Sequence, residues 1–189
     1  MSRTTTPDAA FTDMGKPTQD SNPRPQRRWL GWLLNILLIL VIVFGVQWFK
    51  SRPLISGEAP TLDATTTNAR PFGLAQLRGQ PILVHFWAVW CPICTLQEGT
   101  IEALNADYKV ITVAMESGTD AEINDYRREQ GLSFDVIADP YGETATEWGV
   151  RGVPASFVID GNGNIRFAGV GYHTGVGLRA RLWAASQLW

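Results

Sequence analysis

Hydrophobic and polar residues are arranged in distinct blocks along the 189-residue chain. Residues 1–28 are rich in Thr, Pro, Asp and Arg and lack apolar periodicity, which is typical of a disordered tail. Residues 29–49 then contain no charged side chain. A short linker, residues 50–58, leads into a region where apolar runs alternate with helical patterns. The pattern therefore predicts one folded domain over residues 59–189, behind an apolar segment.

The apolar segment, WLGWLLNILLILVIVFGVQWF, has the length of a membrane span. As a helix rising about 1.5 Å per residue, it would reach roughly 31 Å, close to the thickness of a hydrocarbon core. Trp29, Trp32 and Trp48 lie near its two ends, where indole rings favour the membrane interface. We therefore expect a single transmembrane helix over residues 29–49.

The flanking charges predict the orientation of this helix. Arg24, Arg27 and Arg28 precede the apolar segment, whereas only Lys50 and Arg52 follow it closely. The excess of positive charge places the N-terminus in the cytoplasm and the domain outside. A cleaved signal peptide is the main alternative, but the apolar run is too long and no small-x-small site follows in KSRPLIS. A buried core helix is the other alternative.

The domain itself has the alternating pattern of an α/β fold. Ile82–Trp87 is a continuous apolar run that predicts a buried strand, and Pro92–Asp107 predicts a helix with proline in its first turn. In the middle of the domain, the pattern predicts a strand over Val110–Met115, a helix in GTDAEINDYRREQG ending at Gly131, and a strand near Val136–Ala138. A short helix over Glu143–Trp148 follows, and then a hairpin of Ser156–Ile159 and Ile165–Val170 around DGNGN. The last predicted element is a helix from Thr174 to about Gln187, with Leu178, Leu182 and Trp183 inward. This order predicts a central, mostly parallel sheet with an antiparallel C-terminal hairpin, hence a mixed sheet, flanked by helices.

The distribution of charge argues against one class of partner. Met1–Arg52 holds seven Lys/Arg and three Asp, whereas Pro53–Trp189 holds nine Lys/Arg and fifteen Asp/Glu, a net charge of −6. A nucleic-acid-binding domain usually carries a basic face. The acidic domain therefore disfavours nucleic acid as a partner.

The two cysteines of the chain, Cys91 and Cys94, follow the predicted strand and open the predicted helix. Three residues apart, they lie on one face of the helix, close enough to form a disulfide. The unpaired N–H groups and the positive dipole end of a helix N-terminus lower the pKa of a thiol there, so Cys91 is the expected nucleophile. Cys94, deeper in the helix, would resolve a mixed disulfide. The spacing predicts thiol–disulfide exchange.

Other uses of the two thiols are open. A structural disulfide closing so small a loop would stabilise the fold little. A zinc site needs two further ligands, and only His85 and His173 remain as histidines. A copper(I)-binding or copper-tolerance module is the alternative function, since two thiolates suit that ion. A peroxiredoxin usually has Thr shortly before a lone cysteine, where Ala88 and Val89 stand. Because an extracytoplasmic domain with no other cysteine does not depend on disulfides for stability, we favour a redox-active Cys91–Cys94 pair without a further cofactor.

The motifs FWAVWCPIC and WGVRGVPASFVIDGNGN together closely resemble the thioredoxin superfamily. The intervening block VIADPYGETATEWGV and the apolar N-terminal segment are similar to its membrane-tethered TlpA/ResA-like branch, and the VHFWAxWCPxC form is similar to the ScsD type. The resemblance covers roughly residues 59–187. It implies a thioredoxin-like fold, with Cys91 as nucleophile and Cys94 as resolving thiol.

The resemblance also implies a substrate-docking surface. It implies that the Val153–Pro154 peptide is cis and packs against the thiol pair, where it keeps metals away and pairs its backbone with an extended substrate segment. Trp90, Pro92 and Ile93 would complete the surface beside the nucleophile.

His85 lies six residues before Cys91, where thioredoxins place a buried aspartate that is thought to take the proton of the resolving thiol. A neutral imidazole can accept that proton, and a protonated one would instead stabilise a nearby thiolate. A core histidine satisfied by one hydrogen bond is the equal alternative. The other histidine, His173, is expected to be an ordinary loop residue.

TlpA/ResA-like proteins often have a glutamate and a proline where this chain has Gln97 and Gly99. Because the chain departs from the pattern at both positions, a cytochrome-specific role is not inferred from the resemblance. The expected function is a membrane-anchored, extracytoplasmic oxidoreductase of protein disulfides or dithiols in the inner membrane, acting as a reductase. A reductase in an oxidising compartment needs electrons, which implies a membrane donor of the DsbD/CcdA kind.

Overall fold

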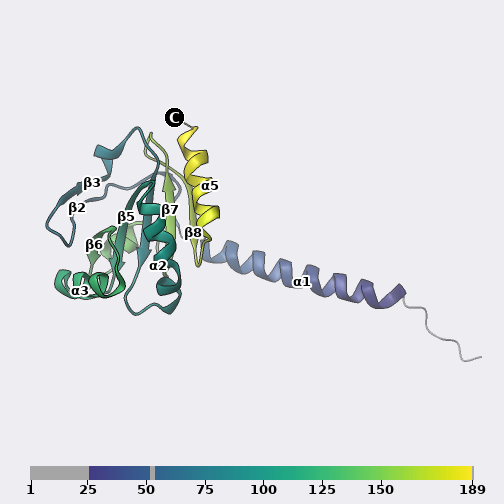
Figure 1. Cartoon of the computed structure of the whole chain (residues 1–189). Helices are drawn as coiled ribbons and strands as arrows, with labels where there is room; N and C mark the ends of the chain where they lie inside the picture. Colours follow the sequence, from purple (N-terminus) through teal and green to yellow (C-terminus); the bar gives the residue numbers. More distant parts are fainter. Residues whose placement is uncertain (1–25, 52–53, 189) are drawn as a thin grey trace, which may run out of the picture. The chain divides into compact units, whose positions relative to one another are not determined.

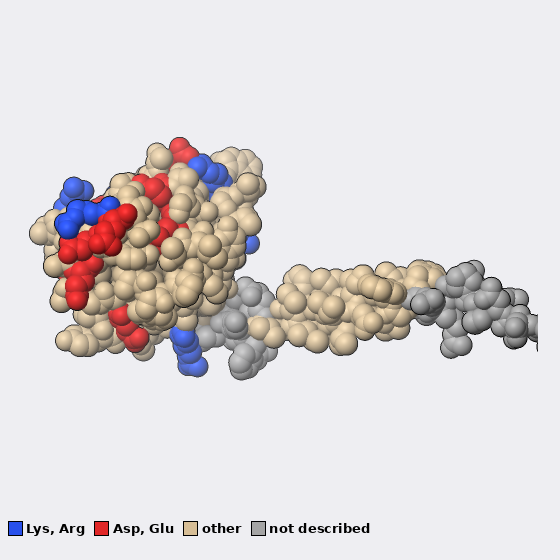
Figure 2. Space-filling view, turned by 60° about the horizontal axis from the view of Figure 1, so that its bottom comes forward, with Lys and Arg blue, Asp and Glu red and all other residues tan. Residues whose placement is uncertain are grey.

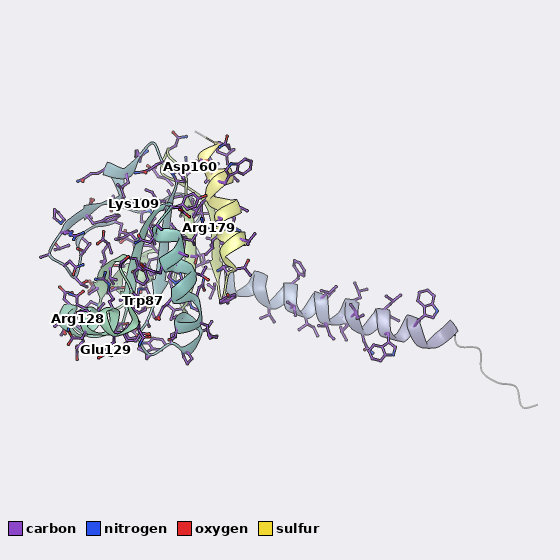
Figure 3. All side chains as sticks on the ribbon, in the orientation of Figure 1. Trp87, Lys109, Arg128, Glu129, Asp160 and Arg179 are labelled. Atoms are coloured by element: carbon purple, nitrogen blue, oxygen red, sulfur yellow. A yellow bond between two sulfur atoms is a disulfide. The ribbon has the colours of Figure 1, made fainter. Side chains whose placement is uncertain are left out.

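The computed structural model describes residues 26–51 and 54–188. The predicted tail lies outside the described residues except for its last three positions. Helix α1, Gln26–Ser51, contains the whole apolar segment, and its described side chains, at 29 and 31–46, are exposed. Figure 2 shows no charged side chain on this described surface, and Figure 3 shows the side chains projecting all around the helix. Among the described residues, no helix combines the length and the hydropathy that crossing a membrane requires.

The domain is built on a six-stranded mixed sheet in the order β1-β8-β7-β4-β5-β6. The central strand β4 is parallel to β5, which is parallel to β6, whereas β7, β8 and β1 continue the sheet on the other side as antiparallel neighbours. The strand bounds are β1 Gly57–Glu58, β4 Ile82–Trp87, β5 Lys109–Met115, β6 Asp135–Asp139, β7 Ala155–Ile159 and β8 Asn164–Val170. The mixed sheet and the antiparallel C-terminal hairpin are confirmed. Strand β1 lies within the range predicted as linker.

Three short elements between β1 and β4 were not predicted. Strands β2, Asp63–Thr65, and β3, Pro71–Gly73, form a separate antiparallel ribbon, followed by the 3-10 helix η1, Leu74–Leu77. Just beyond β2, the backbone N–H of Thr67 donates to the Val136 carbonyl in the edge strand β6 at 2.8 Å. This segment therefore covers part of a sheet edge that would otherwise expose unpaired backbone groups.

Each face of the sheet packs against different helices. Helices α2, Pro92–Asn105, α3, Asp120–Gln130, and α5, Gly175–Ser186, contribute to one buried cluster, and α4, Glu143–Glu147, contributes to the other. In Figure 1, α2 and α5 lie in front of the sheet. Alternate residues of β4 serve the two clusters: Leu83 and Trp87 face α2 and α5, and Phe86 faces α4. The buried β4 thus forms the centre of both cores.

The ends of α3 agree with its sequence signals. The Thr119 side chain accepts from the Glu122 N–H, and the Glu122 carboxylate accepts from the Thr119 N–H at 2.8 Å, which is a capping box. Gly131 ends the helix with φ at +67°, a conformation that favours glycine. Thr119 and Gly131 therefore mark the two ends of the predicted helix.

One predicted core residue is wrong. Leu178 and Leu182 of α5 are fully buried as expected, but Trp183 is 64% exposed. Residues 178, 182 and 185 form the apolar stripe of this helix, and Trp183 follows Leu182 by one position, about 100° around the axis. Its indole therefore lies outside the face that packs on the sheet.

Candidate active site

The thiol pair lies where the central strand runs into the N-terminus of α2. Strand β4 ends at Trp87, and Cys91 is the N-cap residue of α2, with Pro92 in the first turn. Cys91 and Cys94 form a disulfide with their Cα atoms 5.2 Å apart. The Sγ of Cys91 accepts from the backbone N–H of Cys94 at 3.3 Å. A developing negative charge on Cys91 would thus meet an N–H donor and the positive end of the helix dipole.

The loop before β7 lies against the nucleophile. The Val153–Pro154 peptide is cis, as the resemblance implies, and the carbonyl oxygen of Val153 lies 3.8 Å from the Sγ of Cys91. Cys91 is 5% exposed and Cys94 is 1% exposed, so a partner sulfur can approach Cys91 but not Cys94 without movement. Val153 is half-buried and Pro154 is buried. The structure thus brings together two segments about sixty residues apart in sequence.

The side chains around Cys91 are apolar and open to solvent. Trp90 is 56% exposed and donates its indole N–H to the Glu116 carbonyl at 3.0 Å, which fixes the ring beside the disulfide. Pro92 and Ile93 are exposed on the first turn of α2. Of the sequence-predicted docking residues, Trp90, Pro92 and Ile93 are therefore accessible and Val153 is partly so.

His85 is buried on the face of the sheet that holds the thiols. It alternates along β4 with Leu83 and Trp87, both of which belong to the cluster that contains Cys91 and Cys94. Its Nδ1 lies 3.0 Å from the Oγ of Ser156, the residue paired with it on β7. Sequence reasoning missed Ser156, because its position opposite His85 depends on the register of two strands far apart in the chain.

The imidazole of His85 is neutral at physiological pH. Burial, together with the nearby His173, lowers the pKa of His85 to about 3. His85 therefore carries no positive charge while Cys91 and Cys94 form the disulfide. Two interpretations stay: a neutral hydrogen-bonding group beside the thiols, and a core histidine satisfied by Ser156.

The second histidine is a loop residue, but it is buried. His173 is 9% exposed, and its ring packs edge-on against Phe167 of β8 with ring centroids 5.2 Å apart. Its carbonyl accepts a hydrogen bond at 3.3 Å from the side-chain amide of Gln97, a fully buried residue of α2. Burial, and then the charge of Arg181, lower the pKa of His173. The sequence around His173 gives no signal for this burial, because Phe167 and Gln97 contact His173 only in the folded chain.

A metal site at the thiols would need further ligands close to Cys91 and Cys94. Within residues 26–51 and 54–188, no group of three or more His, Cys, Asp or Glu side chains is close enough together to hold a metal ion.

Comparisons with known proteins agree with this geometry. A profile of the AhpC/TSA family matches residues 55–168. The thiol:disulfide interchange protein HelX of Rhodobacter capsulatus is 36% identical over 147 residues, which cover 70% of this chain and 84% of HelX. A thioredoxin-like protein of Haemophilus influenzae is 29% identical over 154 residues, 80% of this chain and 92% of that protein. A crystal structure from Chlorobium tepidum, assigned as a thiol:disulfide interchange protein DsbE, has a TM-score of 0.64 and 26% identity, covering 70% of this chain and 99% of that one.

The fold, the disulfide at the start of α2 and these relatives define one class of protein, the thioredoxin-like thiol–disulfide oxidoreductases. The chain belongs to the AhpC/TSA family, in which its relatives include thiol:disulfide interchange proteins of the DsbE, ResA and HelX type.

The lowered pKa of His85 predicts a loss of stability in acid. Below pH 6.5 the unfolded chain binds a proton at His85 that the folded domain does not bind, so the free energy of unfolding falls as the pH is lowered toward 3. This residue alone should account for about 2 kcal/mol between pH 7 and pH 5. Urea unfolding of the wild type and of His85→Gln at both pH values measures the difference.

His173→Gln is the matched control, because the pKa of His173 is also lowered and contributes in the same direction. His85→Gln should reduce the acid sensitivity of stability more than His173→Gln does. An unchanged pH dependence in His85→Gln would mean that the buried imidazole accepts a proton in the folded state.

Proposed function

We propose that this protein is a membrane-anchored, extracytoplasmic reductase of protein disulfides that works through Cys91 and Cys94. One observation carries the exchange chemistry: Cys91 caps α2, so its sulfur accepts from the Cys94 N–H at the helix N-terminus while Cys94 is buried beneath it. This arrangement favours attack by Cys91 and resolution by Cys94.

The exchange balances in two steps. In the dithiol form, the thiolate of Cys91 attacks one sulfur of a partner disulfide, a mixed disulfide forms, and the other partner sulfur leaves with the electron pair. Cys94 then gives its proton to the first partner thiolate and attacks the sulfur of Cys91, which restores the Cys91–Cys94 disulfide and releases the second partner thiolate. Two electrons pass from the protein to its partner.

The partner is proposed to be an extended protein segment around its own cysteine. The Val153 carbonyl lies beside Cys91 and can accept a backbone N–H from such a segment, and Trp90 and Ile93 offer exposed apolar surface on either side. Backbone pairing provides affinity without a sequence requirement, while the apolar side chains favour partners with apolar residues near the cysteine.

We propose that His85 assists the second step as a neutral acceptor. Its Nδ1 is occupied by Ser156, so Nε2 is the ring atom left for another partner. When Ser156 accepts from Nδ1–H, Nε2 carries the free lone pair. Because the pKa of His85 is about 3, it would act only in the mixed disulfide, by accepting a hydrogen bond from the Cys94 thiol during its attack rather than by holding a proton.

Removal of the resolving thiol should trap substrates. Cys94→Ala should accumulate mixed disulfides through Cys91 on protein partners, because the first step proceeds and the second cannot. Non-reducing gels of cells expressing the variant, followed by mass spectrometry of the adducts, detect them.

Cys91→Ala is the control and should trap far less, since Cys94 is buried. Equal trapping by the two variants, or trapping by neither, would contradict the assigned order of the thiols.

The membrane anchor is proposed from the sequence of residues 29–49, of which the structure describes the side chains of Trp29 and residues 31–46. Twenty-one residues without a charge, tryptophans near both ends and three preceding arginines support a single span with the N-terminus in the cytoplasm.

The anchor predicts where the protein fractionates. The full chain should remain with the membranes after alkaline carbonate washing, and protease added to spheroplasts should digest the domain. Replacing Leu37 and Ile39 with Arg should release the chain from the membrane fraction, because charges near the centre of a span oppose insertion by about 2.5–3.5 kcal/mol each on insertion scales. Full-length wild type in the carbonate-soluble fraction would refute the anchor.

We propose that electrons flow from this protein to its partners, that is, the direction of a reductase. A membrane-tethered exchange protein can reduce disulfides in an oxidising compartment if it is supplied with electrons. It requires a membrane electron donor of the DsbD/CcdA kind, to which tethering would hold the domain close. Copper(I) binding is not proposed, since no observation favours it.

A glutathione titration of the full chain in mild detergent tests the direction. A reductase should have a midpoint potential nearer to that of thioredoxin, about −270 mV, than to that of a strong oxidant such as DsbA, about −120 mV. The fraction of disulfide is read by alkylation and mass spectrometry at each buffer ratio. A midpoint near the DsbA value would reverse the proposed direction and leave the exchange chemistry intact.

A further inference from the structure

The buried side of the thiol site contains two polar atoms without partners. Among the described residues, four buried side-chain atoms have no hydrogen-bond partner, and two of them, Gln97 Oε1 and His173 Nδ1, belong to one pair of contacting residues. The other two are Arg127 Nε on α3 and Trp148 Nε1 on the far face of the sheet. An unpaired buried acceptor is unfavourable, because it has lost its hydrogen bonds to water.

The orientation of the Gln97 amide is fixed. Its Nε2 donates to the carbonyl of His173 at 3.3 Å. Turning the amide over would put Oε1 against that carbonyl, and two acceptors cannot bond to each other. Oε1 is therefore the atom that is left without a donor.

His173 is held just as firmly. Its ring stands edge-on to Phe167, which in turn lies under the guanidinium of Arg181, 3.9 Å from the ring centroid. A Cβ at Gly169 would come within 2.7 Å of its Nε2, so the ring lies directly over that glycine. The backbone of Gly171 raises the pKa of His173, but no hydrogen bond of normal geometry reaches Nδ1.

The Gln97 side chain lies on the same face of α2 as the resolving cysteine. Gln97 follows Cys94 by three residues on α2, so the two side chains share a helix face, and both are buried. In the disulfide form Cys94 carries no proton. Reduction adds two electrons and two protons to the pair, and the S–H of Cys94 becomes a hydrogen-bond donor.

We propose that Gln97 Oε1 accepts a hydrogen bond from the Cys94 thiol when the disulfide is reduced, and that this acceptor thereby stabilises the dithiol form relative to the disulfide form. The inference rests on the proposed exchange function. The reductant is a protein dithiol or two molecules of glutathione, which lose two electrons and two protons in total and form a disulfide. Gln97 is thus a residue that sets the redox equilibrium of the site without reacting itself.

Replacing Gln97 tests the inference. Gln97→Leu and Gln97→Met remove the unpaired acceptor from the disulfide form and the thiol partner from the dithiol form. The equilibrium with glutathione should therefore shift about tenfold toward the disulfide, a midpoint about 30 mV more negative. His173→Phe, which keeps an aromatic ring over Gly169, should leave the equilibrium nearly unchanged, because the carbonyl that orients Gln97 belongs to the backbone.

A second measurement separates this role from a purely structural one. Urea unfolding of the oxidised and the reduced full chain should show that Gln97→Met leaves the oxidised form as stable as wild type or more so, and destabilises the reduced form. A structural role would shift both forms equally. Gln130→Met, an exposed position on α3, is the control for the same chemical change and should alter neither the ratio nor the stabilities.

The outcomes distinguish the two proposals. Equal stability changes in both redox forms, with an unchanged glutathione equilibrium, would overturn the role of Gln97 alone. A wild-type protein that never equilibrates with glutathione would overturn the exchange function itself. Should Gln97→Leu fail to fold, the unbranched Gln97→Met decides, since methionine adapts best to the shape of the site.

Discussion

The site depends on one hydrogen bond at the mouth of α2, from the backbone N–H of Cys94 to the sulfur of Cys91. It exists because Cys91 is the N-cap residue, the position whose side chain normally satisfies a free N–H of the first turn. In most helices this is the task of Ser, Thr, Asp or Asn. Here a sulfur takes their place, so the interaction that starts the helix also stabilises the negative charge that the reaction needs.

That arrangement requires a rigid support. The helix begins five residues after the end of the fully buried β4, and Trp87 at the strand end is fixed by its indole N–H, which donates to Thr112 of β5 at 3.1 Å. In Figure 3, Trp87 is labelled beside α2. The Val153 carbonyl reaches the sulfur through β7, the other neighbour of β4. Both neighbours of one central strand thus help to position the nucleophile.

Sequence reasoning succeeded where signals are local. The apolar run of β4, the proline after Cys91 and the Thr119 and Gly131 ends of α3 each depend on a few adjacent residues, and the structure agrees with them. It failed where burial depends on a distant partner. The two-residue strand β1 exists only by pairing with β8, and His173 is buried only because Phe167 and Gln97 meet it. Trp183 is the opposite case: it was predicted to be buried and is exposed, because apolar character alone does not decide which face of a helix packs on the sheet.

The layer between the sheet and α2 contains polar side chains, and the redox chemistry of the thiol pair offers a reason for them. A row of apolar residues at His85, Ser156, Gln97 and His173 would give a more stable core, because buried polar groups lose hydration. A disulfide, however, is itself weakly polar, whereas its dithiol carries donors and, during turnover, a charge. A core suited only to the disulfide would leave the reduced protein with unsatisfied groups. Acceptors that are unpaired in one redox state and paired in the other divide the penalty between the two states, so that neither is too stable to react.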